Sequence, residues 1–347
     1  MIKDVEYALL EICVTLRKGI MVTIKTVAEK AGVSPTTASY ALNGRPGVKP
    51  ETLQRVIQAA RELDYTPNSL AQSFRNGRSD TLAVLTRESL EDNSIFALEL
   101  MGILSEARIM KYDVLVKSVP EEGLYPELIS SIFASKRVSG VILLGNGFES
   151  LIGQMSERNA NIVLLSSHSG FDISVVNADG EKWIRNITGY LIKKGIKKIK
   201  YMTFALETIE ELNRERGFRK ALEDYGLENR DAVVECGYVP QGIFRSVSEA
   251  VQGDRPQAIV CWNDVLAMKV INILREIGLK VPGDIAVTGF DDIVEDMYFT
   301  PRLTTVKQPF AEKGKYAVQL LGEIIDSKVM TPQKRFVECS LVIGDSA

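Results

Sequence analysis

The sequence is poor in the residue types on which catalysis, metal binding and covalent cross-linking most often depend. It contains a single histidine, His168, and four cysteines, none of which has C-x-x-C spacing or a histidine partner. We therefore expect no metal site, no cofactor and no disulfide, and we expect reduced, mostly buried thiols, as in a cytoplasmic protein. The cysteines are Cys13, Cys236, Cys261 and Cys339.

Long apolar runs and nucleotide-binding loops are also missing. No stretch of about 18 apolar residues is present, so the sequence predicts no membrane-spanning helix and no membrane partner. Gly145-Asn146-Gly147 begins like a dinucleotide loop, but Ser150 stands where the third glycine would be. With no P-loop, no nucleophile elbow and no acid–base group tied to His168, we predict no catalytic residues and no enzyme.

Charge is distributed unevenly along the chain. Residues 21–79 contain eight Lys or Arg and four Asp or Glu, a net charge of +4, and the first twenty residues contain three of each sign. Because the whole chain has a net charge of −3, the remaining residues carry −7. A basic N-terminal segment on an acidic body predicts that phosphate groups are bound at one end of the molecule.

The basic segment begins with two short predicted helices joined by a tight turn. Residues 24–31 form the first helix, with Thr23 as its N-cap and Gly32 as the left-handed residue that ends it. Ser34 caps the second helix and Pro35 takes its first position, where a missing N–H costs nothing. Apolar residues on facing sides pack the two helices together as in a helix-turn-helix.

A third helix, residues 50–63, is predicted to close a small core around the first two. Its apolar stripe consists of Leu53, Val56, Ile57, Ala60 and Leu63. The second helix, which we expect to end at Asn43-Gly44, then has one solvent-facing surface. The residues of that surface are Thr36, Thr37, Ser39 and Tyr40. An ordinary three-helix bundle would show the same pattern, but the positive charge favours DNA binding.

Two segments of this region, TIKTVAEKAGVSPTTASYALNGRPGVKPET and DYTPNSLAQSFRNGRSDTLAVL, resemble the headpiece and hinge of the lactose-repressor (LacI/GalR) family of bacterial transcription regulators. The body continues the resemblance in the family's order with RVSGVILL, RERGFRKAL, AIVCWNDVLAM, VPGDIAVTGFDD and TPRLTTVKQP. The similarity covers the chain from about residue 21 to the C-terminus. It implies a sequence-specific DNA-binding transcriptional regulator, expected to be a repressor.

The resemblance implies a small all-α helix-turn-helix headpiece and an α/β periplasmic-binding-protein-like body of two doubly wound parallel-sheet subdomains. The headpiece is expected at residues 21–66, the hinge at 67–79, and the effector-binding and dimerisation domain at 80–347. Within the body, the N-subdomain is expected at about 80–176 and 307–331 and the C-subdomain at about 177–306 and 332–347. The chain would cross between them near 176–177, 304–308 and 330–334. Short β-rich runs at residues 81–85, 113–117, 138–144, 162–165, 198–203, 258–261 and 285–287 are the predicted strands.

By resemblance, the second helix enters the major groove with its first residues. Tyr40 occupies a position where the family usually has Arg, so a hydroxyl and a ring replace a bidentate guanine contact, and we expect a different base pair there. Lys49 replaces the usual Ser cap of the third helix, a loss of about 0.5–2 kcal/mol. The predicted DNA-binding residues of the headpiece are Thr23, Ser34, Pro35, Thr36, Thr37, Ser39, Tyr40 and Asn43.

The predicted hinge, residues 68–75, resembles a segment that becomes helical only when two copies meet in the minor groove. So short a helix is unstable alone, so its folding is expected to be coupled to DNA binding. Phe74 matches a Leu that wedges between central base pairs and would kink the duplex there. Packing of Phe74 on the body is the alternative. Asn68 and Arg75 complete the predicted DNA-binding set.

By resemblance, the cleft between the subdomains binds a small-molecule effector. Arg214 matches a donor to effector oxygens, Asp291 matches an acceptor from effector hydroxyls, and Asn263 lies in the corresponding loop. Such a trio suits a polyol, so we expect a sugar-like effector, whose apolar face Phe96 and Tyr238 would cover. Taken singly, each of these residues fits a structural role equally well.

Three motifs depart from the family pattern at this site. They are Ser166-Ser167 in place of Asp-Arg, Asn177-Ala178 in place of Asp-Asn, and Asn93-Ser94-Ile95-Phe96 in place of Asn-Pro-Phe-Phe. Ile95 is therefore a predicted effector contact in place of an aromatic residue. The losses indicate an unusual or less polar effector, or one bound weakly, and leave its identity and its action as inducer or co-repressor open.

These observations predict a cytoplasmic homodimer that binds a pseudo-palindromic operator in double-stranded DNA under control of a small-molecule effector. The alternative is a periplasmic-type solute-binding protein without DNA function, which would need an export signal and no basic helix-turn-helix. Residues 1–20 have no counterpart in the family headpiece and fit either an extra amphipathic helix or a translation start at Met21. Asp4, Glu6 and Glu11 disfavour a signal peptide.

Overall fold

The computed structural model falls into two units, Met1–Gly77 and Arg78–Ala347, and each is described by itself. The described residues are 23–42, 44–65, 79–87, 94–119, 129, 132, 138–158, 160–165, 171–206, 208–227, 230–253, 255–293, 298–327 and 331–347. The predicted contacts Asn43, Asn68, Phe74 and Arg75, the hinge and the N-terminal extension lie outside these ranges. Within them, no helix is long and apolar enough to cross a bilayer.

The headpiece contains the three predicted helices, α2 (Ile24–Ala31), α3 (Pro35–Leu42) and α4 (Pro50–Glu62). The Thr23 side chain accepts from the backbone N–H of Thr26 in a capping box, and Gly32 has a φ of 66°, so both predicted ends of α2 are confirmed. Ser34 likewise accepts from the backbone N–H of Thr37 at 3.1 Å. A small core of alanine and valine, Val27, Ala28, Ala31, Ala38, Ala41, Val56, Ala59 and Ala60, joins the three helices.

Two details of α4 bear on the prediction. Ile57 was expected in the apolar stripe, but it is 37% exposed, and Ala59 is buried in the core instead. The predicted stripe is therefore wrong at Ile57, whereas Val56 and Ala60 are buried as expected and Leu53 and Leu63 pack against the core. Lys49 is the N-cap of α4 and makes no side-chain cap hydrogen bond, as expected from its replacement of a capping residue.

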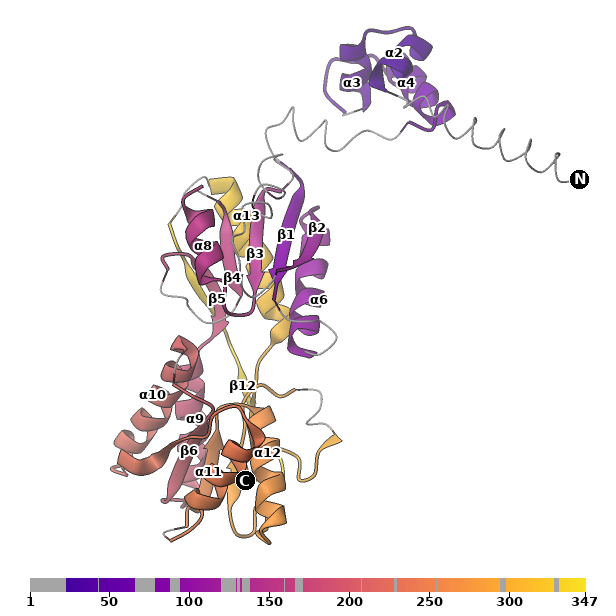
Figure 1. The fold of residues 1–347 in the computed structure, drawn as a ribbon. Helices are drawn as coiled ribbons and strands as arrows, with labels where there is room; N and C mark the ends of the chain where they lie inside the picture. The colour runs from indigo at the N-terminus through magenta and orange to yellow at the C-terminus, as the bar shows by residue number, and fades with distance from the viewer. Residues whose placement is uncertain are drawn as a thin grey trace, which may run out of the picture. The chain divides into compact units, whose positions relative to one another are not determined.

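The first sheet of the body is six-stranded and parallel, with the strand order β11-β5-β4-β3-β1-β2. Its strands are β1 (Thr81–Thr86), β2 (Asp113–Ser118), β3 (Gly140–Leu144), β4 (Ile162–Leu165), β5 (Ser174–Ala178) and β11 (Lys334–Val337). Helices α6 (Ser94–Ile109) and α13 (Phe310–Ser327) cover one face, and α8 (Glu149–Ser156) packs on the other (Figure 1). Burial on both faces explains why β3 and β4 are continuous apolar runs.

The second sheet has the order β7-β6-β8-β9 and is also parallel. Its strands are β6 (Ile199–Thr203), β7 (Val233–Glu235), β8 (Ala258–Cys261) and β9 (Ala286–Thr288). Helices α9 (Gly180–Lys193) and α10 (Ile209–Asp224) lie on one face, and α11 (Pro240–Ala250) and α12 (Asp264–Glu276) on the other. The predicted fold class, two doubly wound parallel sheets, is confirmed. We call the first sheet with its helices the N-subdomain and the second the C-subdomain.

Three segments connect the two subdomains (Figure 1). The chain leaves the N-subdomain after β5, returns along β10 (Thr305–Lys307), and leaves again after β11 to form β12 (Ser340–Val342), which pairs antiparallel with β10. The last crossing differs from the expected position near 330–334 and from the assignment of residues 332–347 to the C-subdomain. Lys334–Val337 is a strand of the first sheet and pairs with β5, a long-range pairing that its mixed sequence KRFV does not indicate.

Helices α6 and α13 approach so closely that two glycines are required at their contact. A Cβ on Gly102 would collide with the backbone oxygen of Ala311, and one on Gly314 would collide with the backbone oxygen of Glu99. Gly153 in α8 is a matched contrast, because a Cβ there would meet only the Phe171 ring at 3.9 Å. Backbone atoms cannot yield as a flexible side chain can, so these helices must separate to admit a methyl group.

We therefore expect Gly102→Ala to lower the free energy of unfolding by about 1–3 kcal/mol through overpacking. The control, Gly153→Ala, should be neutral or stabilising by about 0.4–1 kcal/mol, because it restricts the unfolded chain without a collision. Urea unfolding followed by circular dichroism measures both. Equal stability of the two variants would show that the helices can move apart freely.

Candidate nucleic-acid interface and ligand site

The outer face of α3 is the part of the headpiece best placed to contact DNA. Ser34, Pro35 and Thr36 are exposed, Thr37 is half-buried, and Tyr40 is 41% exposed. The Arg45 guanidinium lies 5.5 Å from the centre of the Tyr40 ring, so a cation adjoins the aromatic side chain. This face therefore offers hydroxyls, a ring and a positive charge at the start and middle of one helix.

Ser39 does not belong to that face. It was expected to be solvent-facing, but only 8% of it is exposed. The neighbouring Ala38 and Ala41 are core residues, and the rotation of α3 that buries them also turns Ser39 inward. Thr23 keeps its position at the start of α2, where its hydroxyl is used as the helix cap.

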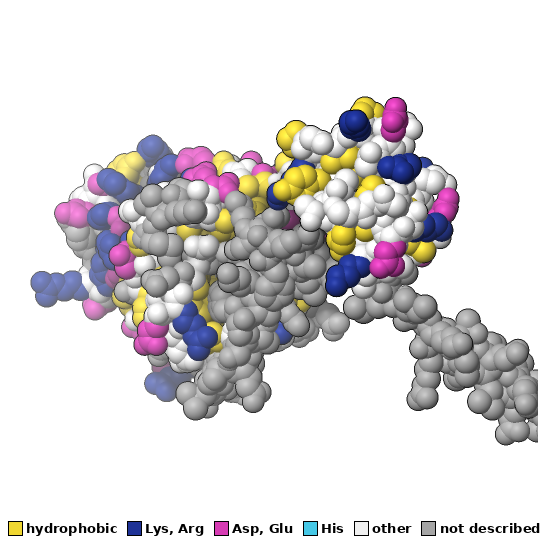
Figure 2. Space-filling model, turned by 90° about the horizontal axis from the view of Figure 1, so that it is seen from above, with side chains coloured by type: hydrophobic (Ala, Val, Ile, Leu, Met, Phe, Trp, Pro, Cys, Tyr) yellow, Lys and Arg dark blue, Asp and Glu magenta, His cyan; other side chains and the backbone are white. Residues whose placement is uncertain are grey.

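The headpiece surface carries more positive than negative side chains. Residues 23–65 contain six Lys or Arg and four Asp or Glu, and Figure 2 shows cationic side chains at several separate places on this unit. One cation, Lys30, is paired with Glu62 at 2.8 Å. Such a surface gives a non-specific attraction to phosphates, on which the α3 face can add sequence preference.

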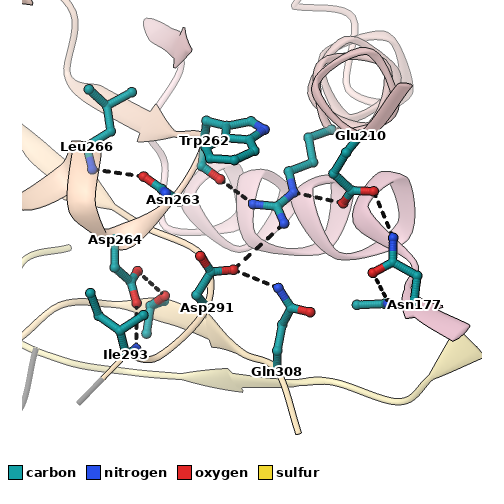
Figure 3. A network of polar contacts seen from close by, with 12 residues as sticks. Asn177, Glu210, Trp262, Asn263, Asp264, Leu266, Asp291, Ile293 and Gln308 are labelled. Atoms are coloured by element: carbon teal, nitrogen blue, oxygen red, sulfur yellow. Dashed lines mark hydrogen bonds and ion pairs between the residues drawn. The ribbon is translucent and has the colours of Figure 1, made fainter. Parts of the chain in front are cut away.

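In the body, a network of polar contacts surrounds Arg214 on α10 (Figure 3). Arg214 is only 5% exposed, and its Nε donates to Glu210 Oε1 at 3.0 Å, one helical turn earlier. Its Nη1 donates to the backbone oxygen of Trp262 at 2.6 Å, and its Nη2 lies 3.7 Å from Asp291 Oδ1. The guanidinium is thus held on three sides by acceptors.

Aromatic rings and helix geometry fix the position of Arg214. Its guanidinium carbon lies 3.9 Å from the centre of the Phe290 ring and 4.7 Å from that of Trp262. Burial opposes the charge of Arg214, but the carboxylates of Glu210 and Asp291 outweigh it and raise its pKa. Thr208 begins α10 with a capping box to Glu211, which sets the first turn and therefore the direction of the next two.

Asp291 lies in the turn that follows β9, beside the crossing strand β10. Its backbone N–H donates to the backbone oxygen of Val306. Gln308 donates twice to Asp291, from its backbone N–H to the backbone oxygen and from Nε2 to Oδ1, the latter at 2.6 Å. The backbone of Asp291 has a φ of 118°, which a non-glycine residue adopts only under constraint. Burial raises the pKa of Asp291, an effect that the nearby Arg214 and the hydrogen bond from Gln308 oppose.

Asn263 and Asp264 follow β8 at the start of α12. Asn263 Oδ1 accepts from the backbone N–H of Leu266 at 2.9 Å as the N-cap of that helix. The fully buried Asp264 accepts from Thr305 Oγ1 at 2.6 Å and from the N–H of Ile293 at 3.1 Å. These two bonds join α12, the turn that carries Asp291, and β10 into one rigid corner (Figure 3).

The remaining predicted effector contacts lie in other surroundings. Phe96 is buried in the core of the N-subdomain, directly beneath Gly145, and the adjacent Ile95 is half-buried on α6. Tyr238 is 60% exposed, stacks on Phe204 at 5.1 Å, and contacts Glu211 Oε1 through its hydroxyl at 3.2 Å. Tyr238 is linked through Phe204 to Trp262, whose ring lies 5.9 Å from that of Phe204.

Sequence reasoning missed four members of the network: Glu210, Trp262, Asp264 and Gln308. Asp264 had a detectable signal, since it follows a buried strand next to Asn263, at the carboxyl end where ligands of open α/β sheets bind. Gln308 stands in the quoted segment TPRLTTVKQP. For Glu210 and Trp262, the roles depend on contacts with Arg214 that no local pattern indicates.

A hollow of about 630 Å³ adjoins the network at the crossing strands. Its walls come from β5 and β11 of the N-subdomain and from the first turns of α9 and α10 of the C-subdomain. Asn177 and Glu210 line it, and a hydrogen bond of 3.0 Å from Asn177 Nδ2 to Glu210 Oε2 joins them. Because both subdomains contribute, the shape of this space depends on the angle between them.

The three cysteines that the structure describes are buried, as expected. Cys236, Cys261 and Cys339 are free thiols with low exposure, and Cys13 lies outside the described residues. Burial raises the pKa of Cys236 to about 11 and that of Cys339 to about 12, so both remain protonated and unreactive at neutral pH. Within the described part of the chain, no group of three His, Cys, Asp or Glu residues is placed to hold a metal ion.

Comparisons with known proteins agree with this architecture. Residues 23–68 match the family described as bacterial regulatory proteins, lacI family, and residues 188–347 match the periplasmic binding protein-like domain. The HTH-type transcriptional repressor PurR of Erwinia tasmaniensis is 31% identical over 316 residues, which cover 89% of this chain and 92% of the relative. Catabolite control protein A of Priestia megaterium is 30% identical, with coverage of 89% and 96%.

Solved structures give the same result. A lac repressor dimer bound to operator and the anti-inducer ONPF has a TM-score of 0.78 at 26% identity and covers 94% of this chain and 98% of its own. A complex of the transcriptional regulator CelR with cellobiose has a TM-score of 0.68 at 25% identity, with coverage of 94% and 100%. With its helix-turn-helix headpiece and its two-subdomain body, this chain belongs to the lacI family of bacterial regulatory proteins and is a DNA-binding transcriptional repressor.

Proposed function

We propose that the protein acts in the cytoplasm as a homodimer that binds a pseudo-palindromic operator, with α3 of each headpiece in a major groove, and that a small molecule bound beside the Arg214 network controls this binding. The observation that carries the proposal is the buried network itself, because Asn177 of β5 donates to Glu210, and Gln308, beside β10, donates to Asp291, so the network is tied to the crossing segments. A ligand that favours one arrangement of the subdomains changes DNA affinity only through that preference.

The operator is read by the exposed face of α3 and positioned by the basic surface of the headpiece. Thr36 and Tyr40 reach base edges, while Lys and Arg side chains bind phosphates. Tyr40 contacts a thymine methyl or accepts and donates through one hydroxyl. The hinge residues Asn68, Phe74 and Arg75 remain proposed minor-groove contacts on the strength of their sequence.

We expect Tyr40→Ala to weaken binding to the specific operator by about 1–3 kcal/mol and to leave binding to random DNA nearly unchanged. Operators are first selected from genomic fragments with the wild-type protein, and affinities are then measured by fluorescence anisotropy at fixed salt. Tyr225→Ala is the matched control, since this tyrosine is 43% exposed on the body. Equal losses on operator and random DNA would show that Tyr40 does not read sequence.

Exposed apolar side chains on α6 and the neighbouring edge strand β2 support a dimer. Met101 is 64% exposed, Leu104 46% and Ile109 67% on the helix, and Leu115 and Val116 are also exposed on the strand. Several exposed apolar side chains on one helix and the adjacent edge strand are typical of an interface. The same surface on two copies would pair about a two-fold axis and set the distance between the headpieces.

We expect Leu104→Glu to shift the protein from dimer to monomer and to weaken operator binding, because a charge buried in an apolar interface is costly. Analytical ultracentrifugation measures the first effect and anisotropy the second. Leu212→Glu on α10 is the control, since that leucine is 40% exposed and lies away from α6 and β2. A Leu104→Glu protein that stays dimeric would exclude this surface as the interface.

Asp291 is the proposed acceptor of an effector hydroxyl. Because burial raises its pKa, the stability contributed by the protonated form is present below the unfolded-state pKa near 3.8 and is lost as the pH rises through the folded-state value. Asn does not titrate. We therefore expect Asp291→Asn to have a Tm equal to or above that of the wild type at pH 7, with the gap narrowing toward pH 4, and to lose the effector response.

Thermal unfolding followed by differential scanning fluorimetry across this pH range checks the expected gap. Asp345→Asn removes one negative charge at an exposed position and serves as the control. A Tm for Asp291→Asn that falls well below the wild type at pH 7 would assign Asp291 a stabilising structural role in place of the proposed one.

A further inference from the structure

Five buried charged side chains alternate in sign across the junction between the subdomains. Glu210, Arg214 and Asp291 belong to the C-subdomain, whereas Lys313 of α13 and Glu99 of α6 belong to the N-subdomain. None is more than 8% exposed. Burial of charged side chains costs free energy unless they are paired, so we treat these five as one structural unit.

The two ends of this series are closed ion pairs. Arg214 Nε lies 3.0 Å from Glu210 Oε1, and Lys313 Nζ lies 2.7 Å from Glu99 Oε1. Asp291 stands between the two cations, and the charges of both lower its pKa against the larger effect of burial. Arg214 lies within 4 Å of it, but no ion pair joins Asp291 to Lys313. The only neighbouring pair in this series without a direct ion pair is Asp291 and Lys313, and these two residues belong to different subdomains. We call the space between them the interval.

Hydrogen-bonding positions remain unfilled around this interval. Gln308 is 7% exposed, and its Oε1 is buried without a hydrogen-bond partner in the described part of the chain. Asp291 uses Oδ1 for both Gln308 and Arg214, and its Oδ2 has no hydrogen bond from the residues that the structure describes. The Lys313 ammonium has three donors and is engaged by Glu99 and by the Phe310 ring, 5.4 Å away.

We propose that Lys313 is an effector-binding residue, and that the effector fills the interval between Lys313 and Asp291 by accepting from the Lys313 ammonium and donating to Asp291 and Gln308. Glu99 acts through Lys313 as a positioning residue. Adjacent hydroxyl groups satisfy both demands, since each donates and accepts. This inference rests on the proposed function and specifies the chemistry of its effector.

The charges define the class of ligand further. Glu210, Asp291 and Glu99 are three buried carboxyl groups beside two cations, and each cation already has its own carboxylate partner. A phosphate or carboxylate on the ligand would bring a further negative charge next to these buried groups, so the effector is an uncharged polyol. An anionic sugar is disfavoured at this position.

Glu99 connects the proposed effector contact to α6, the helix that carries the proposed dimer surface. Glu99 is on the buried face of α6, and Met101 and Leu104, on the exposed face of the same helix, belong to the proposed dimer surface. An effector that joins Lys313 to Asp291 therefore couples the C-subdomain to α6. It favours one subdomain angle to the extent that it binds that arrangement more tightly.

The test compares the wild type with the double variant Lys313→Met, Glu99→Leu, which removes both charges and keeps apolar volume, a replacement that buried ion pairs often tolerate. The probes are glucose, galactose, ribose and cellobiose, each at millimolar concentration, with glucose 6-phosphate and glucuronate as anionic counterparts. Melting temperature and operator affinity are recorded for each probe. Operator affinity without probe reports whether each variant is folded.

We expect at least one neutral sugar to raise the melting temperature of the wild type saturably and to change its operator affinity, with anionic counterparts about tenfold weaker or more. The midpoint for that sugar should rise about tenfold in the double variant. Glu99→Gln keeps an acceptor for Lys313 and should rescue most of the response. Arg245→Met with Glu249→Gln, which removes an exposed ion pair of 2.8 Å on α11, is the matched control and should change nothing.

Each other outcome is decisive. An unchanged midpoint in the folded double variant contradicts a role for Lys313, and tighter binding of the anionic sugars contradicts the assigned class. Failure of every neutral sugar, with operator binding intact, overturns this inference and leaves the proposed function standing. Failure of the wild type to prefer any operator would instead overturn the proposed function.

Discussion

The body depends on how it accommodates one buried guanidinium at the junction of two sheets. Arg214 would destabilise an apolar interior, and it is tolerated because Glu210, the Trp262 carbonyl and Asp291 surround it with acceptors while two aromatic rings exclude water. These partners come from α10, from the end of β8 and from the turn after β9. The charge therefore holds together three segments whose relative positions define the site.

The headpiece follows the opposite strategy, with a core that contains no buried charge among its described residues. Small side chains allow α2, α3 and α4 to pack closely, and the N-caps Thr23 and Ser34 satisfy helix ends that the short sequence could not stabilise otherwise. On the outer face of α3, Thr36 and Tyr40 remain exposed. Apolar packing thus supports the proposed DNA-binding surface, whereas buried ion pairs and hydrogen bonds support the proposed ligand site.

Local patterns predicted the helices of the headpiece and the buried strands, because caps, helical spacing and continuous apolar runs act within a few residues, and the family resemblance added the fold class. They failed where a residue's environment depends on distant packing. Ser39 and Ile57 exchanged their expected exposure because the rotation of a helix is set by its neighbours. Lys334–Val337 joined the first sheet through pairing with β5, although KRFV has no apolar alternation that would indicate a buried strand.

The sequence by itself determined the family, the basic headpiece and the presence of Arg214 and Asp291 at matching positions. Only the tertiary structure decided that the Arg214 donors are already engaged within the protein and that Glu99 and Lys313 form a buried pair nearby. The physical reason is that a hydrogen bond or ion pair is a property of two groups brought within about 3 Å. Residues more than two hundred positions apart carry no mark of such a meeting in either local sequence.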